Sequence, residues 1–220
     1  MTEPPPQTRN AQAAATRERL IEAATELFAR KGYGAVSAAN IVAAAGVTRG
    51  ALYHHFPAGK SGLLGATAER LVEDLVATLA AKNAPSGQDK ASAASGQPLT
   101  LADVPSLLGA FFEAASTPAY RQIVLEDAPS VLGSQAWRAV EHKHTVGFIE
   151  AALETLQRSG VLVAGPIRPL AILIFGACCE ASLEIAHAND REAAIAQGTD
   201  AMMALLSGLI RHAPDPPQSP

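Results

Sequence analysis

Arg49, Tyr53 and Lys60 carry the side chains of this sequence that are best suited to contact nucleic acid. An arginine near the start of a helix in the major groove can donate two hydrogen bonds to guanine O6 and N7. Tyrosine hydroxyls and lysine ammonium groups can bind phosphates, which fixes the register of such a helix on the duplex. The residue types and their spacing therefore predict base readout by Arg49 and phosphate contacts by Tyr53 and Lys60.

Two short helices joined by a glycine turn are predicted to position these side chains. Ser37 and Thr48 can each cap a helix, because their hydroxyls accept a hydrogen bond from an otherwise unpaired backbone N–H. Gly46 lies where the first of these helices must stop, since glycine enters the left-handed conformation without steric cost. Leu52 and Phe56 fit the buried face of the second helix. This pattern is a helix-turn-helix unit and predicts a sequence-specific DNA-binding protein.

The charge is distributed unevenly along the chain. The net charge is −4, yet residues 1–60 carry seven basic and four acidic residues, whereas the remaining residues carry 10 basic and 17 acidic ones. Because DNA affinity depends on neutralising phosphates, the basic N-terminal segment is expected to contact DNA. The acidic remainder is expected to form a second domain with another role.

The composition favours packed helices in a cytoplasmic protein. Hydrophobic residues make up 48% of the chain. The chain contains no run of about 18 apolar residues without charge, so no membrane span is expected. The N-terminus lacks the basic start and apolar core of a signal peptide. The two cysteines are adjacent, at positions 178 and 179, and form no disulfide framework, which indicates a reducing compartment.

Helical periodicity predicts an all-α fold of about nine helices and no sheet. Besides the two short helices of the helix-turn-helix unit, longer helices are expected over residues 16–31, 60–84, 101–116, 134–160, 169–189 and 190–212, and a shorter one over residues 119–125. Residues 16–60 are expected to form the DNA-binding domain and residues 61–212 a larger helical domain for ligand binding and dimerisation. Residues 1–15 and 213–220 are predicted to be disordered tails, and residues 84–98 a loop.

The chain resembles the TetR family of transcriptional regulators over residues 16–64. The residues that carry the resemblance are Ala23-Ala24, Leu27-Phe28, Gly32-Tyr33, Ile41, Ala44-Ala45-Gly46-Val47, Leu52-Tyr53-His54-His55-Phe56 and Lys60. The resemblance implies an all-helical homodimer that binds a DNA operator, usually as a repressor that a small-molecule effector releases. It implies no enzymatic activity and no cofactor or metal.

Carried over by position, the resemblance also implies roles for individual residues. The residues expected to contact base edges are Thr48, Arg49 and Gly50. The residues expected to contact the DNA backbone are Ser37, Tyr53, His54 and Lys60. Ala38 and Ala39 depart from the family pattern, which often has a hydroxyl and a longer polar or basic side chain there. The first short helix is therefore expected to read few bases.

Two further sets of residues in the acidic part suggest a pocket and an interface. Ligand pockets combine apolar walls with a few polar groups, so aromatic and histidine residues on central helices are candidates: Phe111, Phe112, Tyr120, Trp137, His142 and Phe148. Helical stripes near the C-terminus suggest a dimer interface, because dimers read two half-sites; they comprise Ile172, Phe175, Gly176, Cys179, Leu183, Met202, Leu205, Leu206 and Leu209. The same patterns are also compatible with an ordinary core.

Two other functions are compatible with parts of the sequence. Two Glu-x-x-His pairs, at 141–144 and 184–187, with Glu113 and Glu150 as added ligands, resemble the ligand pattern of di-iron carboxylate bundles. A helical ligand carrier without DNA binding is the other alternative. Neither accounts for the helix-turn-helix pattern with its basic residues Arg49 and Lys60.

Overall fold

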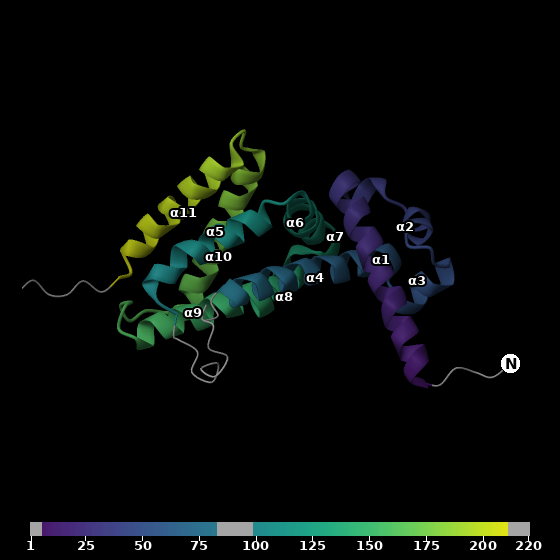
Figure 1. The fold of residues 1–220 in the computed structure, drawn as a ribbon, viewed down its shortest axis with the longest axis horizontal. Helices are drawn as coiled ribbons and strands as arrows, with labels where there is room; N and C mark the ends of the chain where they lie inside the picture. The colour runs from purple at the N-terminus through teal and green to yellow at the C-terminus, as the bar shows by residue number, and fades with distance from the viewer. Residues whose placement is uncertain (1–5, 83–98, 211–220) are drawn as a thin grey trace, which may run out of the picture. The chain divides into compact units, whose positions relative to one another are not determined.

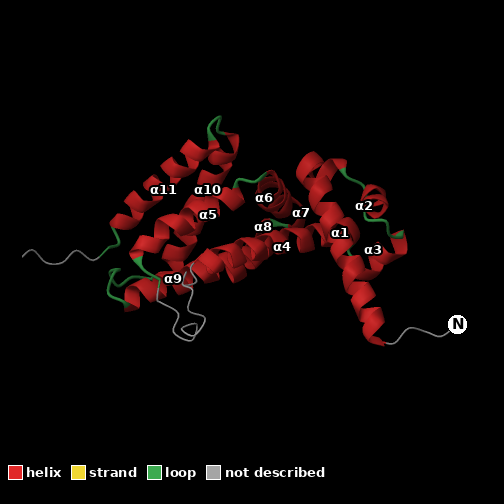
Figure 2. Ribbon diagram, viewed as in Figure 1, coloured by secondary structure: helices red, strands yellow, loops and turns green. Residues whose placement is uncertain are grey.

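The computed structural model describes residues 6–82 and 99–210 of the 220-residue chain. Within these two stretches the structure is built of helices and turns, and no strand is formed (Figure 2). Leu162 and Ile210 make one isolated bridge. The all-α prediction is confirmed. The predicted loop 84–98 and the predicted tail 213–220 lie outside the described residues.

The described chain divides into two compact units, and the division differs from the predicted boundary at residue 60. One unit contains the described residues up to Leu75 together with Ala115–Glu141, and the other contains Val76–Ala114 with the described residues from His142 onward. The segment 115–141 joins the N-terminal helices because it contributes buried apolar side chains to their core. The functional assignment of residues 16–60 and 61–212 stays a prediction.

The first unit is formed by the N-terminal helices and a group of short helices from the middle of the chain (Figure 1). Its elements are α1 (Pro6–Ala35), α2 (Ala38–Ala44), α3 (Arg49–His55), the first part of α4 (Gly59–Lys82), α6 (Pro118–Tyr120), the π-helical η2 (Arg121–Asp127), α7 (Ala128–Leu132) and α8 (Ser134–Glu141). The helix α1 contacts α2, α3, α6 and η2. Fully buried side chains such as Phe28, Ile41, Leu52 and Ile123 form the core.

The N-terminal helix is longer than the sequence predicts. It begins at Pro6, so the prediction of a disordered tail is wrong for residues 6–15. Four of the ten residues in this stretch are alanine, which has the highest intrinsic helix propensity. Near the other end, Gly32 has φ +71 and kinks the helix, and a Cβ there would contact the Gln122 side chain.

The second unit consists of longer helices around an apolar interior. Its elements are the C-terminal part of α4, η1 (Leu101–Asp103), α5 (Val104–Ala115), the π-helical η3 (His142–Val146), α9 (Gly147–Arg158), α10 (Ile167–His187) and α11 (Arg191–Ser207). The helix α10 packs against α9, α11 and η3. The predicted helix 134–160 is interrupted by η3, and it ends as expected at Gly160, which has φ +78.

One helix in the described part of the chain, α10, is long and apolar enough to cross a membrane by length and composition alone. Core helices of soluble proteins pass the same test, and α10 buries Ala171, Phe175, Cys178 and Ile185. Its length and composition therefore reflect at least in part its packing in the second unit.

Candidate nucleic-acid interface and apolar cavity

The helix α2 begins at a complete capping box. The Asn40 N–H donates to Ser37 Oγ at 3.1 Å, and the Ser37 N–H donates to Asn40 Oδ1 at 3.0 Å. Ser37 thus caps the helix as predicted, and its own hydroxyl also donates to Asn40 Oδ1 at 2.7 Å. Two backbone N–H groups that no helical bond would satisfy are paired in this way.

A tight turn joins α2 to α3. Gly46 has φ +62 and the Val47 N–H donates to the Val42 carbonyl at 3.0 Å, which closes the end of α2. Thr48 then caps α3, because its Oγ1 accepts from the Ala51 N–H at 3.2 Å. Ile41 and Leu52 are fully buried and hold the two helices against the core. The predicted caps and the predicted stop at Gly46 are confirmed.

The face of α3 that remains accessible carries Arg49 and Tyr53. Thr48, Arg49, Gly50 and His54 are exposed, and 43% of the Tyr53 surface is accessible. The Arg49 guanidinium lies 5.7 Å from the centre of the Tyr53 ring. An arginine over an aromatic face is held by a cation–π interaction while its outer N–H groups stay available. The two side chains therefore form one accessible polar face at the start of the helix.

Gly59 fixes the position of the Tyr53 ring. Gly59 begins α4 with φ +64, and a Cβ at this position would lie 3.0 Å from Tyr53 Cε1. A side chain at residue 59 would be strained and would also displace the ring. The ring of the candidate phosphate ligand thus rests on the backbone that starts α4.

Gly59→Ala is expected to destabilise the fold by about 1–2 kcal/mol, because an L-residue pays a steric penalty in the left-handed region. It should also weaken DNA binding by shifting Tyr53. Urea unfolding measures the first effect and fluorescence anisotropy of a labelled duplex measures the second. Gly34→Ala is the matched control, since a Cβ at Gly34 meets nothing within 4 Å. Equal stability of the two variants would contradict this role of Gly59.

The Lys60 side chain makes its hydrogen bonds within the first unit. Its ammonium group donates to the Tyr33 carbonyl at 2.9 Å and to the Val36 carbonyl at 2.8 Å, and it lies 3.7 Å from the centre of the Tyr33 ring. Two of its three N–H groups are therefore used to hold the segment between α1 and α2. Contact with phosphate stays a prediction for Lys60, and a structural role is the one that these hydrogen bonds support.

Arg17 is a residue near the reading helix that sequence reasoning missed. It extends from α1 and its guanidinium lies 5.5 Å from the centre of the Phe56 ring. Burial lowers the pKa of His55, and the charges of His54 and Arg17 lower it further. Only the folding of α1 against α3 brings Arg17 to this place, so no local sequence signal could have identified it.

The middle segment of the chain is hydrogen-bonded to the end of α1. The Tyr33 N–H donates to Asp127 Oδ2 at 2.8 Å. Burial and the Asp127 charge together raise the pKa of the Tyr33 hydroxyl. Tyr33 is therefore contacted both by Asp127 of η2 and by Lys60 of α4.

Glu141 ends α8 near the buried Trp137. Burial raises the pKa of Glu141 from its usual 4.5 to about 7, against smaller opposing effects of Trp137 and Arg138. Because the folded-state pKa lies above the unfolded value, the folded state binds more protons between these two pH values. The contribution of Glu141 to stability is then greatest below pH 4.5 and is lost as the pH rises through about 7.

Glu141→Gln is accordingly expected to be more stable than wild type at pH 8, by about 1–3 kcal/mol after allowance for partial exposure. At pH 5 the two proteins should differ much less, because the wild-type carboxyl is then mostly protonated. Urea unfolding at both pH values checks this. A difference that is the same at pH 5 and pH 8 would rule out titration of Glu141 as its cause.

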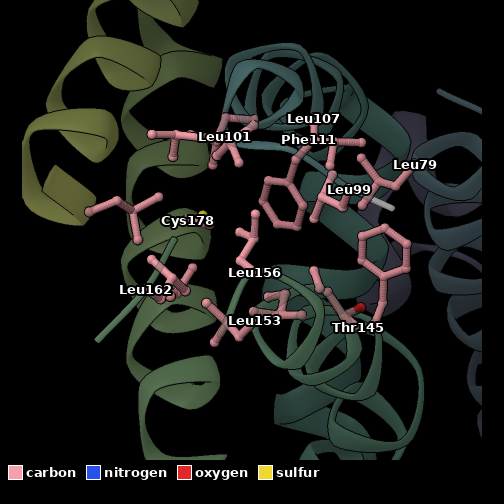
Figure 3. Close-up of a pocket in the computed structure, with 17 residues that line it drawn as sticks. Leu79, Leu99, Leu101, Leu107, Phe111, Thr145, Leu153, Leu156, Leu162 and Cys178 are labelled. Atoms are coloured by element: carbon pink, nitrogen blue, oxygen red, sulfur yellow. The ribbon is translucent and has the colours of Figure 1, made fainter. Parts of the chain in front are cut away.

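An apolar cavity of about 100 Å³ lies within the second unit. Figure 3 shows side chains from α4, α5, α9 and α10 converging on it, among them Leu79, Phe111, Leu153 and Cys178. Every lining residue is apolar except Thr145 and Cys178. Burial raises the pKa of the Cys178 thiol to about 12, so the thiol is neutral.

The structure places only two of the six predicted pocket residues, Phe111 and Phe148, at this cavity. Tyr120 and Trp137 are buried in the first unit and do not line this cavity, so their role as ligand-pocket residues stays a prediction. Phe112 is fully buried, and its ring would meet a Cβ placed at Gly198 of α11. Neither Phe112 nor His142 lines the cavity. Aromatic residues were a poor guide because they fill both cores, while most of the cavity wall is leucine.

The predicted interface residues also divide into two groups. Phe175 and Met202 are buried and therefore not accessible to a partner, whereas Leu206 is half-buried and lines the cavity. Ile172, Gly176 and Leu205 are exposed, and Leu183 and Leu209 are half-buried, as is Cys179. Leu173, which sequence reasoning left out, is 69% exposed, as is Leu205.

Two of the six groups offered as di-iron ligands, Glu150 and His187, have other partners. Glu150 accepts a hydrogen bond from Arg168 at 2.9 Å, and His187 Nδ1 lies 2.7 Å from the Leu183 carbonyl on an exposed part of α10. These contacts explain why glutamate and histidine occur at these positions without invoking a metal.

Comparison with known proteins identifies both parts of the chain. Residues 20–67 match the bacterial regulatory proteins of the tetR family, and residues 104–209 match the tetracyclin repressor-like C-terminal domain. The HTH-type transcriptional regulator CymR of Pseudomonas putida is 43% identical over 72 residues, which is 33% of this chain and 35% of CymR. The regulator LmrA of Bacillus subtilis (strain 168) is 42% identical over 48 residues, 22% of this chain and 26% of LmrA. The chain thus matches about a quarter to a third of the length of these two relatives.

A solved structure extends the similarity over nearly the whole chain. A TetR-family transcriptional regulator from Pectobacterium atrosepticum is 33% identical, with a TM-score of 0.69, and the match covers 92% of this chain and 97% of that one. This similarity includes the capped helix-turn-helix and the helices that surround the cavity. The chain belongs to the TetR family of DNA-binding transcriptional regulators.

Proposed function

We propose that the protein binds a palindromic DNA operator as a homodimer, represses transcription there, and is released by a small apolar molecule. The observation that carries the proposal is the accessible Arg49–Tyr53 face on the capped second helix of the helix-turn-helix, which is the helix that enters the major groove in this motif. The membership of the chain in the TetR family supports the same function. No chemical step is required of the protein.

The contacts with DNA fall into two groups. Thr48, Arg49 and Gly50 begin α3 and are exposed, so they meet base edges, with Arg49 reading guanine. Tyr53 and His54 meet the sugar-phosphate backbone, and Ser37 does so at the start of α2, where the helix N-terminus favours an anion. Lys60 adds positive charge nearby while its hydrogen bonds hold Tyr33 and Val36.

The exposed apolar residues of α10 and α11 support self-association. Ile172, Leu173 and Gly176 on α10 and Leu205 on α11 form what we call the α10–α11 apolar surface. Large apolar residues exposed together on adjacent helices favour a protein interface. A two-fold dimer uses the same surface on both subunits and presents two reading helices to two half-sites.

The path of α4 supports release by a ligand. Leu79 of α4 lines the cavity, while Gly59 and Lys60 at the other end of the same helix hold Tyr53 and the segment before α2. A ligand that binds the cavity more tightly in the DNA-incompetent state shifts the population away from DNA binding. A displacement of α4 would thus reach the reading helix. The two cysteines are free, which is typical of proteins in a reducing compartment. This supports action in the cytoplasm, where the chromosome is accessible.

Hydrogen exchange with and without a random-sequence DNA duplex pool tests the site directly. Peptides that cover α2, α3 and the start of α4 should exchange more slowly with DNA at low salt, because bound phosphates and bases shield them. Peptides from α10 serve as the internal comparison and should not respond to DNA. Protection restricted to the second unit would contradict the assignment of the reading face.

A further inference from the structure

Among the described residues that line the cavity, Thr145 is the one with a side-chain hydroxyl group. All other side chains around it are hydrocarbon, apart from the neutral thiol of Cys178 (Figure 3). Thr145 is completely buried, and its Oγ1 has no hydrogen-bond partner among the described residues. Buried hydroxyls are normally paired, so an orphan in a cavity wall requires an explanation.

Other hydroxyls in the helices show how Thr145 differs. Thr25, Thr67, Thr155 and Ser182 each donate to the carbonyl four residues earlier, at 2.8–2.9 Å. This bond satisfies a helical hydroxyl without any outside partner. Thr145 lies in the π-helical η3, whose backbone is wound more widely than an α-helix, and it makes no such bond. Single π-helical turns inside helices frequently occur at functional sites.

We propose that the effector is a small, uncharged, mainly apolar molecule with one polar group, such as a hydroxyl or carbonyl, which hydrogen-bonds to Thr145 Oγ1. This inference rests on the proposed ligand-responsive function and names the chemical class of the ligand. The volume of about 100 Å³ restricts the ligand to a compact molecule, because it is smaller than the engineered apolar cavity of about 150 Å³ that binds benzene.

The rest of the wall excludes charged ligands. It offers no ionised side chain, because Cys178 is protonated and every other lining residue is neutral. A carboxylate or ammonium group buried there would be unpaired, which is strongly unfavourable. A molecule with several polar groups would likewise leave all but one of them unsatisfied.

Phenol and toluene are suitable probes, because they have nearly the same size and differ by a hydroxyl in place of a methyl group. Their affinities are measured by isothermal titration calorimetry on the full-length wild type, Thr145→Val and Thr145→Ser. Valine keeps the shape of threonine without the hydroxyl, whereas serine keeps the hydroxyl. The ratio of the phenol affinity to the toluene affinity removes any general change in the cavity, and comparison of this ratio between the proteins removes the different hydration of the two probes.

The ratio is expected to fall about five- to tenfold in Thr145→Val and to stay near the wild-type value in Thr145→Ser. Benzoate should not bind any of the three proteins. An unchanged ratio in Thr145→Val, failure of both probes to bind wild type, or binding of benzoate as tightly as phenol would overturn the inference. The operator affinity is measured in parallel: if it is insensitive to a bound probe, the proposed release mechanism fails while the assignment of Thr145 stands.

Discussion

Gly176→Glu and Leu205→Glu are each expected to convert the dimer into monomers and to weaken operator binding at least about a hundredfold. Both residues belong to the α10–α11 apolar surface, and Leu205 is 69% exposed in the isolated chain. A glutamate there would be buried without a partner in the dimer, at a cost of several kcal/mol. A monomer presents one reading helix and contacts one half-site. Sedimentation velocity measures the association and fluorescence anisotropy measures the operator affinity.

The fold of the monomer should survive these changes. A Cβ at Gly176 meets nothing within 4 Å, and glutamate has a higher helix propensity than glycine. Val163→Glu is the matched control, because Val163 is 40% exposed in the connection between α9 and α10, outside the α10–α11 apolar surface. Circular dichroism should be unchanged in all three variants. A wild-type protein that sediments as a monomer at micromolar concentration would contradict the proposed dimer.

Arg49→Ala is expected to remove discrimination at one base pair in each half-site, at about 1–3 kcal/mol per half-site. The physical reason is that alanine cannot supply the two parallel donors that match guanine O6 and N7. Because a dimer carries two copies of the residue, the loss on a palindrome should be roughly twice that on one half-site. Competition between the operator and variants with single base-pair changes measures it.

Two further substitutions separate base readout from charge. Arg49→Lys keeps the positive charge but not the planar fork, so it should lose most of the discrimination. Arg30→Ala removes an exposed arginine of α1 and should weaken binding to all sequences slightly, if at all. If Arg49→Ala weakened all sequences equally, Arg49 would be a phosphate contact and not a reader.

The helix-turn-helix could be predicted from the sequence because its signals are local. Ser37 and Thr48 cap the helices that follow them, and Gly46 has the positive φ that the turn requires. Each of these features depends on residues only three or four positions away. The same holds for the apolar spacing that places Leu52 and Phe56 in the core.

The cavity and the division into units could not be predicted, because both depend on contacts between distant segments. Trp137 is an aromatic residue of the kind that often lines ligand pockets. Its side chain is nevertheless buried in the core of the first unit. Leu206 lies on an apolar stripe that could face either a partner or the interior, and the fold turns it toward the cavity. Sequence patterns show that a helix face is apolar but not what covers it.

Lys60 illustrates a related limit of sequence reasoning. A lysine at the start of a helix beside a reading unit has the charge that a phosphate contact needs. The folded chain instead brings two backbone carbonyls within reach, 24 and 27 residues away in the sequence. A buried carbonyl that lacks a partner is unfavourable, so the ammonium group is used inside the unit.

Selection of bound duplexes from a random DNA pool by the purified full-length protein tests the central claim most directly. The recovered sequences should share an inverted repeat, since a two-fold dimer reads the same half-site on each strand. The half-site centres should lie about 34–36 Å apart, or roughly 10 base pairs, or a multiple of this distance. A pool without enrichment, or one enriched only for a single unrepeated site, would contradict operator recognition by a dimer of α3 helices.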